Sequence, residues 1–156
     1  MIDVENNGRV RLFRLNRPEA KNAFNEALYD SLTELLIEAE GDSTVAVVII
    51  TGQGDSFSSG TDVVELGQRM ADPSFTPGKH GFPGLADTLV DFSKPLLSAV
   101  NGIGLGIGVT ILGLSDLVFM ADSARVKCPF TDLALAPEAA SSFTFPTIMG
   151  RQNATW

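Results

Sequence analysis

Residues 45–51 constrain the fold most strongly, because they form an almost unbroken run of β-branched side chains. Such a run is typical of a strand buried on both faces, as in parallel sheets that are covered by helices. Residues 9–15 are predicted as an earlier strand, and residues 25–40 as a helix with Asn25 as N-cap and Gly41 as its stop. The order strand, helix, strand predicts an α/β fold with crossover connections.

Three further elements continue this alternation. Residues 96–100 are predicted as a buried strand, residues 106–114 as a helix and residues 117–120 as another strand. Residues 67–87 contain three prolines and four glycines, so we expect an irregular loop there, of the kind that often acts as a lid. Near the start, Asn7-Gly8 predicts a tight hairpin turn, because this pair tolerates positive φ angles.

Composition excludes several classes of protein. The 156 residues correspond to one domain, and a hydrophobic fraction of 44% excludes a disordered chain. A net charge of −8 argues against a nucleic acid or an anionic membrane as partner. The single cysteine, Cys128, cannot form an internal disulfide, and no Cys/His cluster indicates a metal site. Residues 1–5 do not resemble a signal peptide, so we expect a cytoplasmic protein.

Residues 95–115 have a competing interpretation. The stretch carries no charge and contains Gly102, Gly104, Gly106 and Gly108, which is compatible with a membrane helix that packs through small residues. However, Asn101-Gly102 is a turn signal in its middle, and the strand and helix pattern continues on both sides. A buried strand, a turn and a buried helix therefore explain the stretch better than a membrane span.

Two segments, residues 51–62 and residues 98–108, have the form of a strand, a glycine-rich turn and a helix. Glycine lets the backbone turn sharply and approach a ligand, and a helix N-terminus adds positive potential. Two such turns facing each other would provide the paired N–H donors of an oxyanion hole. Two alternatives are a purely structural corner and a dinucleotide site, but the glycines do not follow the G-x-G-x-x-G spacing.

Four segments carry a family resemblance: residues 15–24 (LNRPEAKNAF), residues 57–62 (FSSGTD), Lys94-Pro95, and Asn101-Gly102 with the alternating glycines after it. In this order and spacing they resemble the crotonase superfamily of enoyl-CoA hydratases and isomerases. The resemblance implies a crotonase-like fold of repeated ββα units, with spiral sheets and flanking helices. It also implies an acyl-CoA thioester substrate, no separate cofactor, and a homo-oligomer, either a trimer or a hexamer.

The resemblance also assigns the thioester site. In this family two backbone N–H groups bind the thioester oxygen, and here they are those of Thr61 and Ile107. Because backbone groups do this work, the side chains at the two positions need not abolish it. The resemblance places five further residues along the bound acyl-CoA: Ala23, Ser59, Gly60, Asp62 and Gly106.

The positions of the acidic residues indicate which reaction of this family to expect. Hydratases of this family use two glutamates, and the corresponding positions here are Thr110 and Phe130, so we do not expect ordinary hydratase chemistry. Residues 135–150 instead resemble the stretch of enoyl-CoA delta isomerases in which the catalytic glutamate follows a proline, which implies Glu138 as the base. Taken alone, Glu138 after Pro137 is more typical of a helix start than of a catalytic base. An apolar pocket would raise its pKa and suit it to proton transfer.

Several polar residues are predicted to be structural. Asp62 and Glu65 serve a helix start, Asp116 is a turn acid, and His80 is a solvated loop residue. Cys128 is predicted as a small, buried apolar group.

The predicted function is therefore a double-bond shift in an unsaturated fatty acyl-CoA. Two alternatives remain open: a hydratase or other crotonase reaction, and a non-catalytic module that binds acyl-CoA or protein. Family chains are longer and finish with helices that close the acyl pocket. We therefore expect residues 1–156 to form a core domain that lacks this C-terminal helical region and exposes apolar surface.

Overall fold

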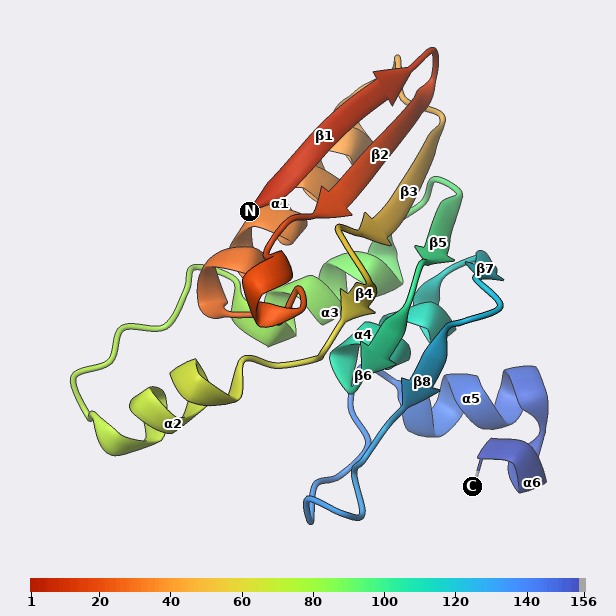
Figure 1. Cartoon of the computed structure of the whole chain (residues 1–156). Helices are drawn as coiled ribbons and strands as arrows, with labels where there is room; N and C mark the ends of the chain where they lie inside the picture. Colours follow the sequence, from red (N-terminus) through yellow and green to blue (C-terminus); the bar gives the residue numbers. More distant parts are fainter. Residues whose placement is uncertain (155–156) are drawn as a thin grey trace.

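A computed structural model of the chain describes residues 1–154, which form two β-sheets flanked by helices (Figure 1). The larger sheet has five strands in the order β1-β2-β3-β5-β7, and only β1 and β2 are antiparallel. Its strands are β1 (Ile2–Asn7), β2 (Val10–Leu15), β3 (Val47–Gly52), β5 (Leu96–Val100) and β7 (Leu117–Met120). The prediction of an α/β fold with crossover connections is confirmed.

The smaller sheet has three short parallel strands: β4 (Ser56–Ser58), β6 (Ile103–Leu105) and β8 (Arg125–Lys127). Each follows a strand of the larger sheet, so the chain alternates between the two sheets before it enters a helix. This is the repeated ββα arrangement that the family resemblance implies. The residues themselves predicted a glycine-rich turn between strand and helix and not a second strand, because a strand of three residues is too short to show a period of two.

The helices are α1 (Glu26–Gly41), α2 (Val63–Ala71), α3 (Gly81–Asp91), α4 (Ile107–Thr110), α5 (Ser141–Met149) and α6 (Arg151–Ala154), with 3₁₀ turns η1 (Pro18–Ala20) and η2 (Ile111–Leu114). The prediction for α1 is confirmed, since the Asn25 side chain accepts a hydrogen bond of 2.9 Å from the Leu28 N–H and the helix ends at Gly41. None of the helices within residues 1–154 is long and apolar enough to cross a bilayer.

The core lies between the larger sheet and helices α1 and α3 (Figure 1). Leu28, Leu32 and Leu36 recur along one face of α1 and are fully buried in this core. Truncating a fully buried leucine of this kind to alanine costs ~2–5 kcal/mol. The larger sheet and these helices therefore form a well-packed core. Its strands β3 and β5 lead, through β4 and β6, into the two glycine turns.

The prediction of an irregular loop over residues 67–87 is wrong, because α2 and α3 occupy most of it and only residues 72–80 lie between them. Pro83 is the third residue of α3, where a backbone N–H has no acceptor within the helix and proline is tolerated. The hairpin is also shifted by one residue: the strands end at Asn7 and start at Val10, so the turn residues are Gly8 and Arg9.

Large apolar side chains are exposed on β7 and α5, as the sequence predicts for the C-terminal part. All four residues of β7 are exposed, and Phe119 is the most exposed of them at 61%. On α5 the exposed large apolar residues are Phe143, Ile148 and Met149. This surface is separate from the glycine turns.

Candidate active site

The two glycine turns meet at one edge of the smaller sheet. β4 and β6 are parallel neighbours, so the chain leaves both strands at the same edge and turns at Gly60 and Gly106. Gly60 has φ +91°, and a Cβ atom added to it would lie 2.8 Å from the Leu105 carbonyl oxygen. A Cβ atom added to Gly106 would lie 3.9 Å from the Gly60 Cα. The close contact at Gly60 and the positive φ of both residues, +50° at Gly106, favour glycine, and the two predicted donor segments lie side by side.

The N–H groups after these glycines are available to a ligand. Thr61 pairs with Phe24 in a parallel bridge, in which the Gly60 carbonyl and the Asp62 N–H bond to Phe24. The Thr61 N–H therefore points away from Phe24, because donors alternate along an extended chain. Ile107 is the first residue of α4, where the N–H has no acceptor within the helix. The arrangement can supply two N–H donors to one oxygen atom.

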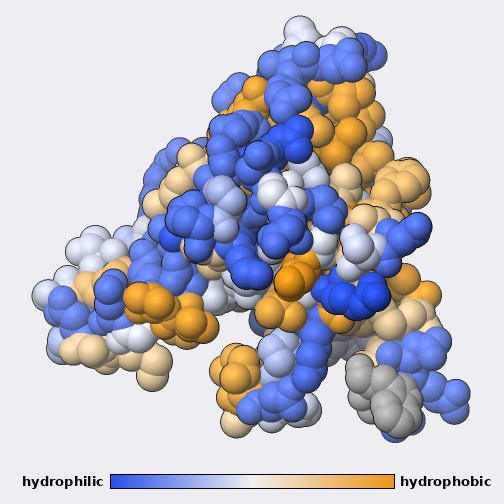
Figure 2. Space-filling view, in the orientation of Figure 1, coloured by the Kyte–Doolittle hydropathy of each residue, from blue (hydrophilic) through white to orange (hydrophobic). Residues whose placement is uncertain are grey.

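Both donors border a cavity of about 490 Å³. Figure 2 shows it as a hollow between apolar side chains on α2 and on the segment after β8. Seven of the eight predicted site residues line it: Ser59, Gly60, Thr61, Asp62, Gly106, Ile107 and Glu138. The eighth, Ala23, is buried next to the lining residue Phe24. Most of the remaining lining is apolar: Val63, Leu66, Phe82, Leu105, Pro129, Phe130, Leu133 and Leu135.

Glu138 presents one carboxylate oxygen without a partner to this environment. Its Oε1 accepts a hydrogen bond of 2.7 Å from the Thr110 hydroxyl, whereas its Oε2 is buried and has no hydrogen-bond partner. Burial raises the pKa of Glu138 above the ordinary value, and the hydrogen bond from Thr110 opposes this only in part. The direction agrees with the raised pKa expected for an apolar pocket, and a carboxyl whose ionised form is destabilised by burial is suited to accepting a proton and returning it.

The interpretation of Glu138 as a helix start is wrong. The helix that follows it, α5, begins at Ser141, and the residues between adopt left-handed backbone conformations, Ala139 at φ +46° and Ala140 at φ +56°. Glu138 therefore lies in an irregular segment. Of the apolar residues near it in the chain, Leu135 lines the cavity, whereas Phe143 is exposed.

The other carboxylates of the lining are engaged in structure. Asp62 caps α2 by accepting from the Val64 and Glu65 N–H groups, as the sequence predicts, and pairs with Arg17 at 3.1 Å. Glu65 accepts from the Glu26 N–H at 2.7 Å, and Glu26 pairs with Arg69 at 2.9 Å. Both hydratase positions also lie at this site: Thr110 contacts Glu138, and Phe130 lines the cavity. Glu138 is thus the carboxylate with a buried, unpartnered oxygen at the cavity.

Tyr29 is a site residue that the sequence did not reveal. It lines the cavity, and its hydroxyl lies 3.1 Å from the Thr61 Oγ1. Burial raises the pKa of Tyr29 to about 12, so it remains a neutral hydroxyl. Its position on the apolar face of α1 is typical of a core aromatic residue, and no signal in the sequence separates it from the core.

The remaining predicted polar residues have these outcomes. Cys128 is half-buried, and burial, with the nearby Glu138 charge, raises the pKa of its thiol to about 11. Asp116 accepts a hydrogen bond of 2.8 Å from the Leu96 N–H, which confirms a structural role. His80 lies in the segment between α2 and α3, as expected, but it is not solvated: its Nε2 is buried without a hydrogen-bond partner, 3.8 Å from a Glu34 carboxylate oxygen.

Comparison with known proteins agrees with this architecture. The family model described as enoyl-CoA hydratase/isomerase matches residues 5–156, and the chain belongs to this family. It is 37% identical to enoyl-CoA delta isomerase 2 of Rattus norvegicus over 98% of the chain, and 34% identical to 2,3-dehydroadipyl-CoA hydratase of Escherichia coli over 97% of it. The crystal structure of an enoyl-CoA hydratase from Mycobacterium marinum superimposes with a TM-score of 0.95 at 55% identity, covering 99% of this chain and 72% of that one.

The chain spans 39% of the length of the rat relative and 58% of the Escherichia coli relative. The names of these relatives are divided between isomerases and hydratases. The choice between the two reactions therefore depends on the residues of this site.

Proposed function

We propose that this protein shifts a double bond in an unsaturated fatty acyl-CoA, from the β,γ to the α,β position. The observation that carries the proposal is the buried, unpartnered Oε2 of Glu138 in the cavity that the Gly60 and Gly106 turns also border. The apolar lining suits a hydrocarbon chain, and Thr61 and Ile107 supply N–H groups for the thioester oxygen. The names of the rat and mouse relatives, both enoyl-CoA delta isomerases, support the same reaction.

The reaction needs one base. The α-carbon C–H bond breaks, its proton passes to the Glu138 Oε2, and the electron pair delocalises onto the thioester oxygen as a dienolate. The Thr61 and Ile107 N–H groups stabilise that oxyanion, and each such donor contributes ~2.7–4 kcal/mol by mutational measures. The Oε2–H bond then breaks, a C–H bond forms at the γ-carbon, and the double bond moves into conjugation with the carbonyl. No atom is gained or lost.

Water addition would require different residues. A hydratase needs one group to activate water and another to manage the α-carbon proton. The two positions that carry these groups in hydratases are occupied by a hydroxyl at Thr110, which bonds to Glu138, and by the apolar ring of Phe130. This arrangement favours isomerisation over hydration.

The finer features of the protein are also proposals. We propose that Ala23, Ser59, Gly60, Asp62 and Gly106 contact the bound acyl-CoA, and that CoA enters as part of the substrate with no separate cofactor. A homo-oligomer, a trimer or a hexamer, and a cytoplasmic location complete the proposal. Light scattering of the purified protein tests the oligomeric state, and imaging of a tagged protein in cells tests the location.

The decisive experiment follows conversion of a β,γ-unsaturated acyl-CoA by the absorbance of the conjugated product. We expect Glu138→Gln to lower kcat by roughly 10²–10⁴-fold while acyl-CoA binding is retained, because the amide cannot accept the proton. Binding without turnover in the unmodified chain would indicate a non-catalytic module. Addition of water to a crotonyl thioester would indicate a hydratase, and an unchanged pH–rate profile in Glu138→Gln would remove Glu138 from the mechanism.

A further inference from the structure

Thr110 is one of the few polar side chains that are fully buried. Its hydroxyl has a single hydrogen and two acceptors within reach, the Glu138 Oε1 at 2.7 Å and the Ile107 carbonyl oxygen at 3.5 Å. The shorter contact to the carboxylate is the stronger one, since hydrogen bonds to ionised acceptors are short and about twice as strong as neutral ones. The hydroxyl therefore donates to Glu138.

We infer that Thr110 is a positioning residue, which holds the Glu138 Oε1 so that proton transfer takes place at Oε2 alone. This inference rests on the proposed function and deepens it. With one oxygen held, the carboxyl group cannot rotate freely, and the same oxygen must take the proton from the α-carbon and return it at the γ-carbon. A transfer confined to one oxygen requires only a short movement along one face of the substrate.

The backbone around Thr110 supports this role. Ile107 and Thr110 are the first and last residues of α4, one turn apart, so the same turn carries an oxyanion donor and the partner of the base. All four residues of α4 are buried. A Cβ atom added to Gly108 would lie 2.7 Å from the Ser58 carbonyl oxygen, so α4 packs directly on the backbone of β4. The spacing between the thioester oxygen and the base is thus set by one rigid turn.

The electrostatic surroundings give the inference a measurable consequence. Burial raises the pKa of Glu138, and the Thr110 hydroxyl lowers it by bonding to the ionised form. Tyr29 on α1 and Cys128 after β8 also experience the Glu138 charge, but with pKa values of about 12 and about 11 both are neutral near pH 7. The other charged groups of the cavity are Glu26, Asp62, Glu65 and Arg69, all engaged in ion pairs or hydrogen bonds to the backbone.

The test compares Thr110→Val with Thr110→Ser. Valine preserves the shape without the hydroxyl, and serine preserves the hydroxyl. We expect Thr110→Val to move the Glu138 titration to higher pH, observed by ¹³C NMR of the carboxyl carbon that disappears in Glu138→Gln. We also expect kcat to fall about 10–100-fold at little cost in KM, as for a misplaced catalytic group. Thr110→Ser should restore both.

Thr33→Val is the matched control. Thr33 is also fully buried and helical, and its hydroxyl donates to the Tyr29 carbonyl at 2.8 Å. This variant should lose stability without moving the Glu138 titration. The inference is overturned if Thr110→Val titrates Glu138 at the original pH, or if Thr33→Val moves it equally. If the titration moves as expected but the unmodified chain converts no unsaturated acyl-CoA, the proposed function fails and the role of Thr110 in holding the carboxylate stands.

Discussion

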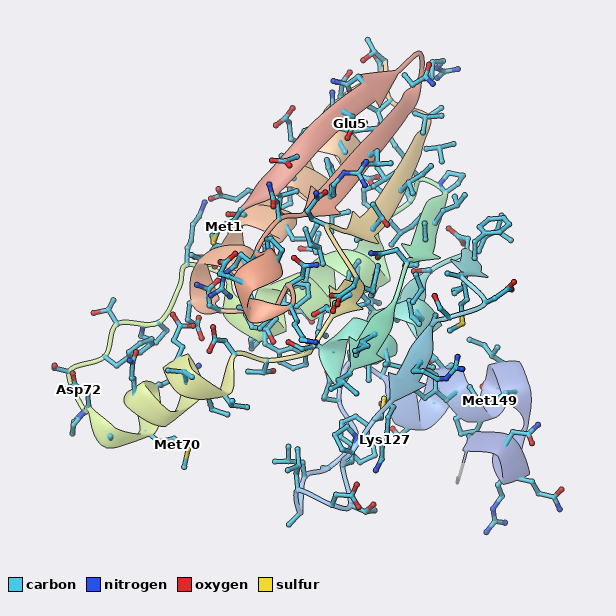
Figure 3. All side chains as sticks on the ribbon, viewed as in Figure 1. Met1, Glu5, Met70, Asp72, Lys127 and Met149 are labelled. Carbon is cyan, nitrogen blue, oxygen red and sulfur yellow. The ribbon has the colours of Figure 1, made fainter. Side chains whose placement is uncertain are left out.

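The two walls of the cavity are built differently. The inner wall consists of the turns at Gly60 and Gly106 with helix α4, and it is packed backbone against backbone. The outer wall consists of helix α2, which residues 72–80 connect to α3, and the loop 129–135. α2 has no buried residue, and Val63 and Met70 are 74% and 82% exposed. Figure 3 shows Met70 and Asp72 at the far end of α2, well away from the sheets.

Polar contacts hold the outer wall in place. Arg69 of α2 pairs with Glu26 of α1, and the Asp30 carboxylate of α1 accepts from three backbone N–H groups of residues 79–81. On the other side, Lys127 pairs with Asp132 at 2.6 Å across the base of the loop. The proposed function accounts for the difference, because an oxyanion site would have to be preorganised, whereas a hydrocarbon chain needs apolar surface that can adapt.

Among changes that compare the two walls, Gly60→Ala in the inner wall should have the largest effect. The added methyl group would press on the Leu105 carbonyl at 2.8 Å, and the φ of +91° is strained for alanine. Displacement of the Thr61 N–H should lower kcat at least about 100-fold, the cost of one oxyanion donor. The control is Gly67→Ala in α2, where the new methyl group meets nothing within 4 Å. It should keep its activity and gain about 0.5–1 kcal/mol of local helix stability. Equal losses in the two variants would contradict the distinction between the walls.

Tyr29→Phe should have an intermediate effect. It removes the hydroxyl that lies 3.1 Å from the Thr61 Oγ1 and leaves the ring packed against Phe24 at 5.0 Å. Loss of one neutral hydrogen bond costs ~0.5–1.5 kcal/mol. If the whole cost falls on the transition state, kcat should decrease by up to about tenfold. Steady-state kinetics with a thermal melt measures both quantities. A decrease in melting temperature without a change in kcat would place Tyr29 in the core alone.

Asp30→Asn should weaken the outer wall in a pH-dependent way. Burial would raise the pKa of Asp30, but hydrogen bonds from the Gly81, His80 and Lys79 N–H groups outweigh it, and the pKa is lowered. This stabilisation is present above the unfolded-state pKa of about 3.9 and is lost as pH falls through the lowered folded value. Because asparagine keeps one acceptor oxygen, the variant should lose only ~1 kcal/mol of local stability at pH 7. The equilibrium constant for local opening of residues 78–81 should therefore increase about fivefold. Hydrogen exchange between pH 3 and 7 measures it, and an unchanged exchange profile would contradict the role of Asp30.

Arg69→Ala should have the smallest effect. The Arg69 side chain is 50% exposed, and a partly exposed ion pair contributes ~0.2–1 kcal/mol. We expect KM to rise about two- to fivefold with kcat unchanged, and the same rise in the unmodified chain when salt is added. A fall in kcat would show that α2 affects the inner wall, and would contradict the distinction between the two walls.

Much of the fold could be predicted from sequence because its signals are local. The β-branched run, the periodic face of α1 and the Asn25 cap each depend on neighbouring residues, and they identified β3 and α1. The strands of three residues could not be found this way, because they exist only through pairing with one another. The loop expected at residues 67–87 was wrong for a related reason: proline and glycine at helix ends resemble loop residues until the helix boundaries are known.

The candidate site likewise combines features that the sequence predicts with features that depend on the tertiary structure. The sequence by itself determined the glycines, the lack of carboxylates at Thr110 and Phe130, and the presence of Glu138 after a proline. Only the tertiary structure decided that Thr110 bonds to Glu138 across 28 residues, that Tyr29 reaches Thr61 across 32, and that one carboxylate oxygen is left buried and free. Hydrogen bonds and burial depend on distances in space, and residues this far apart in the chain acquire them only when the sheets bring their turns together.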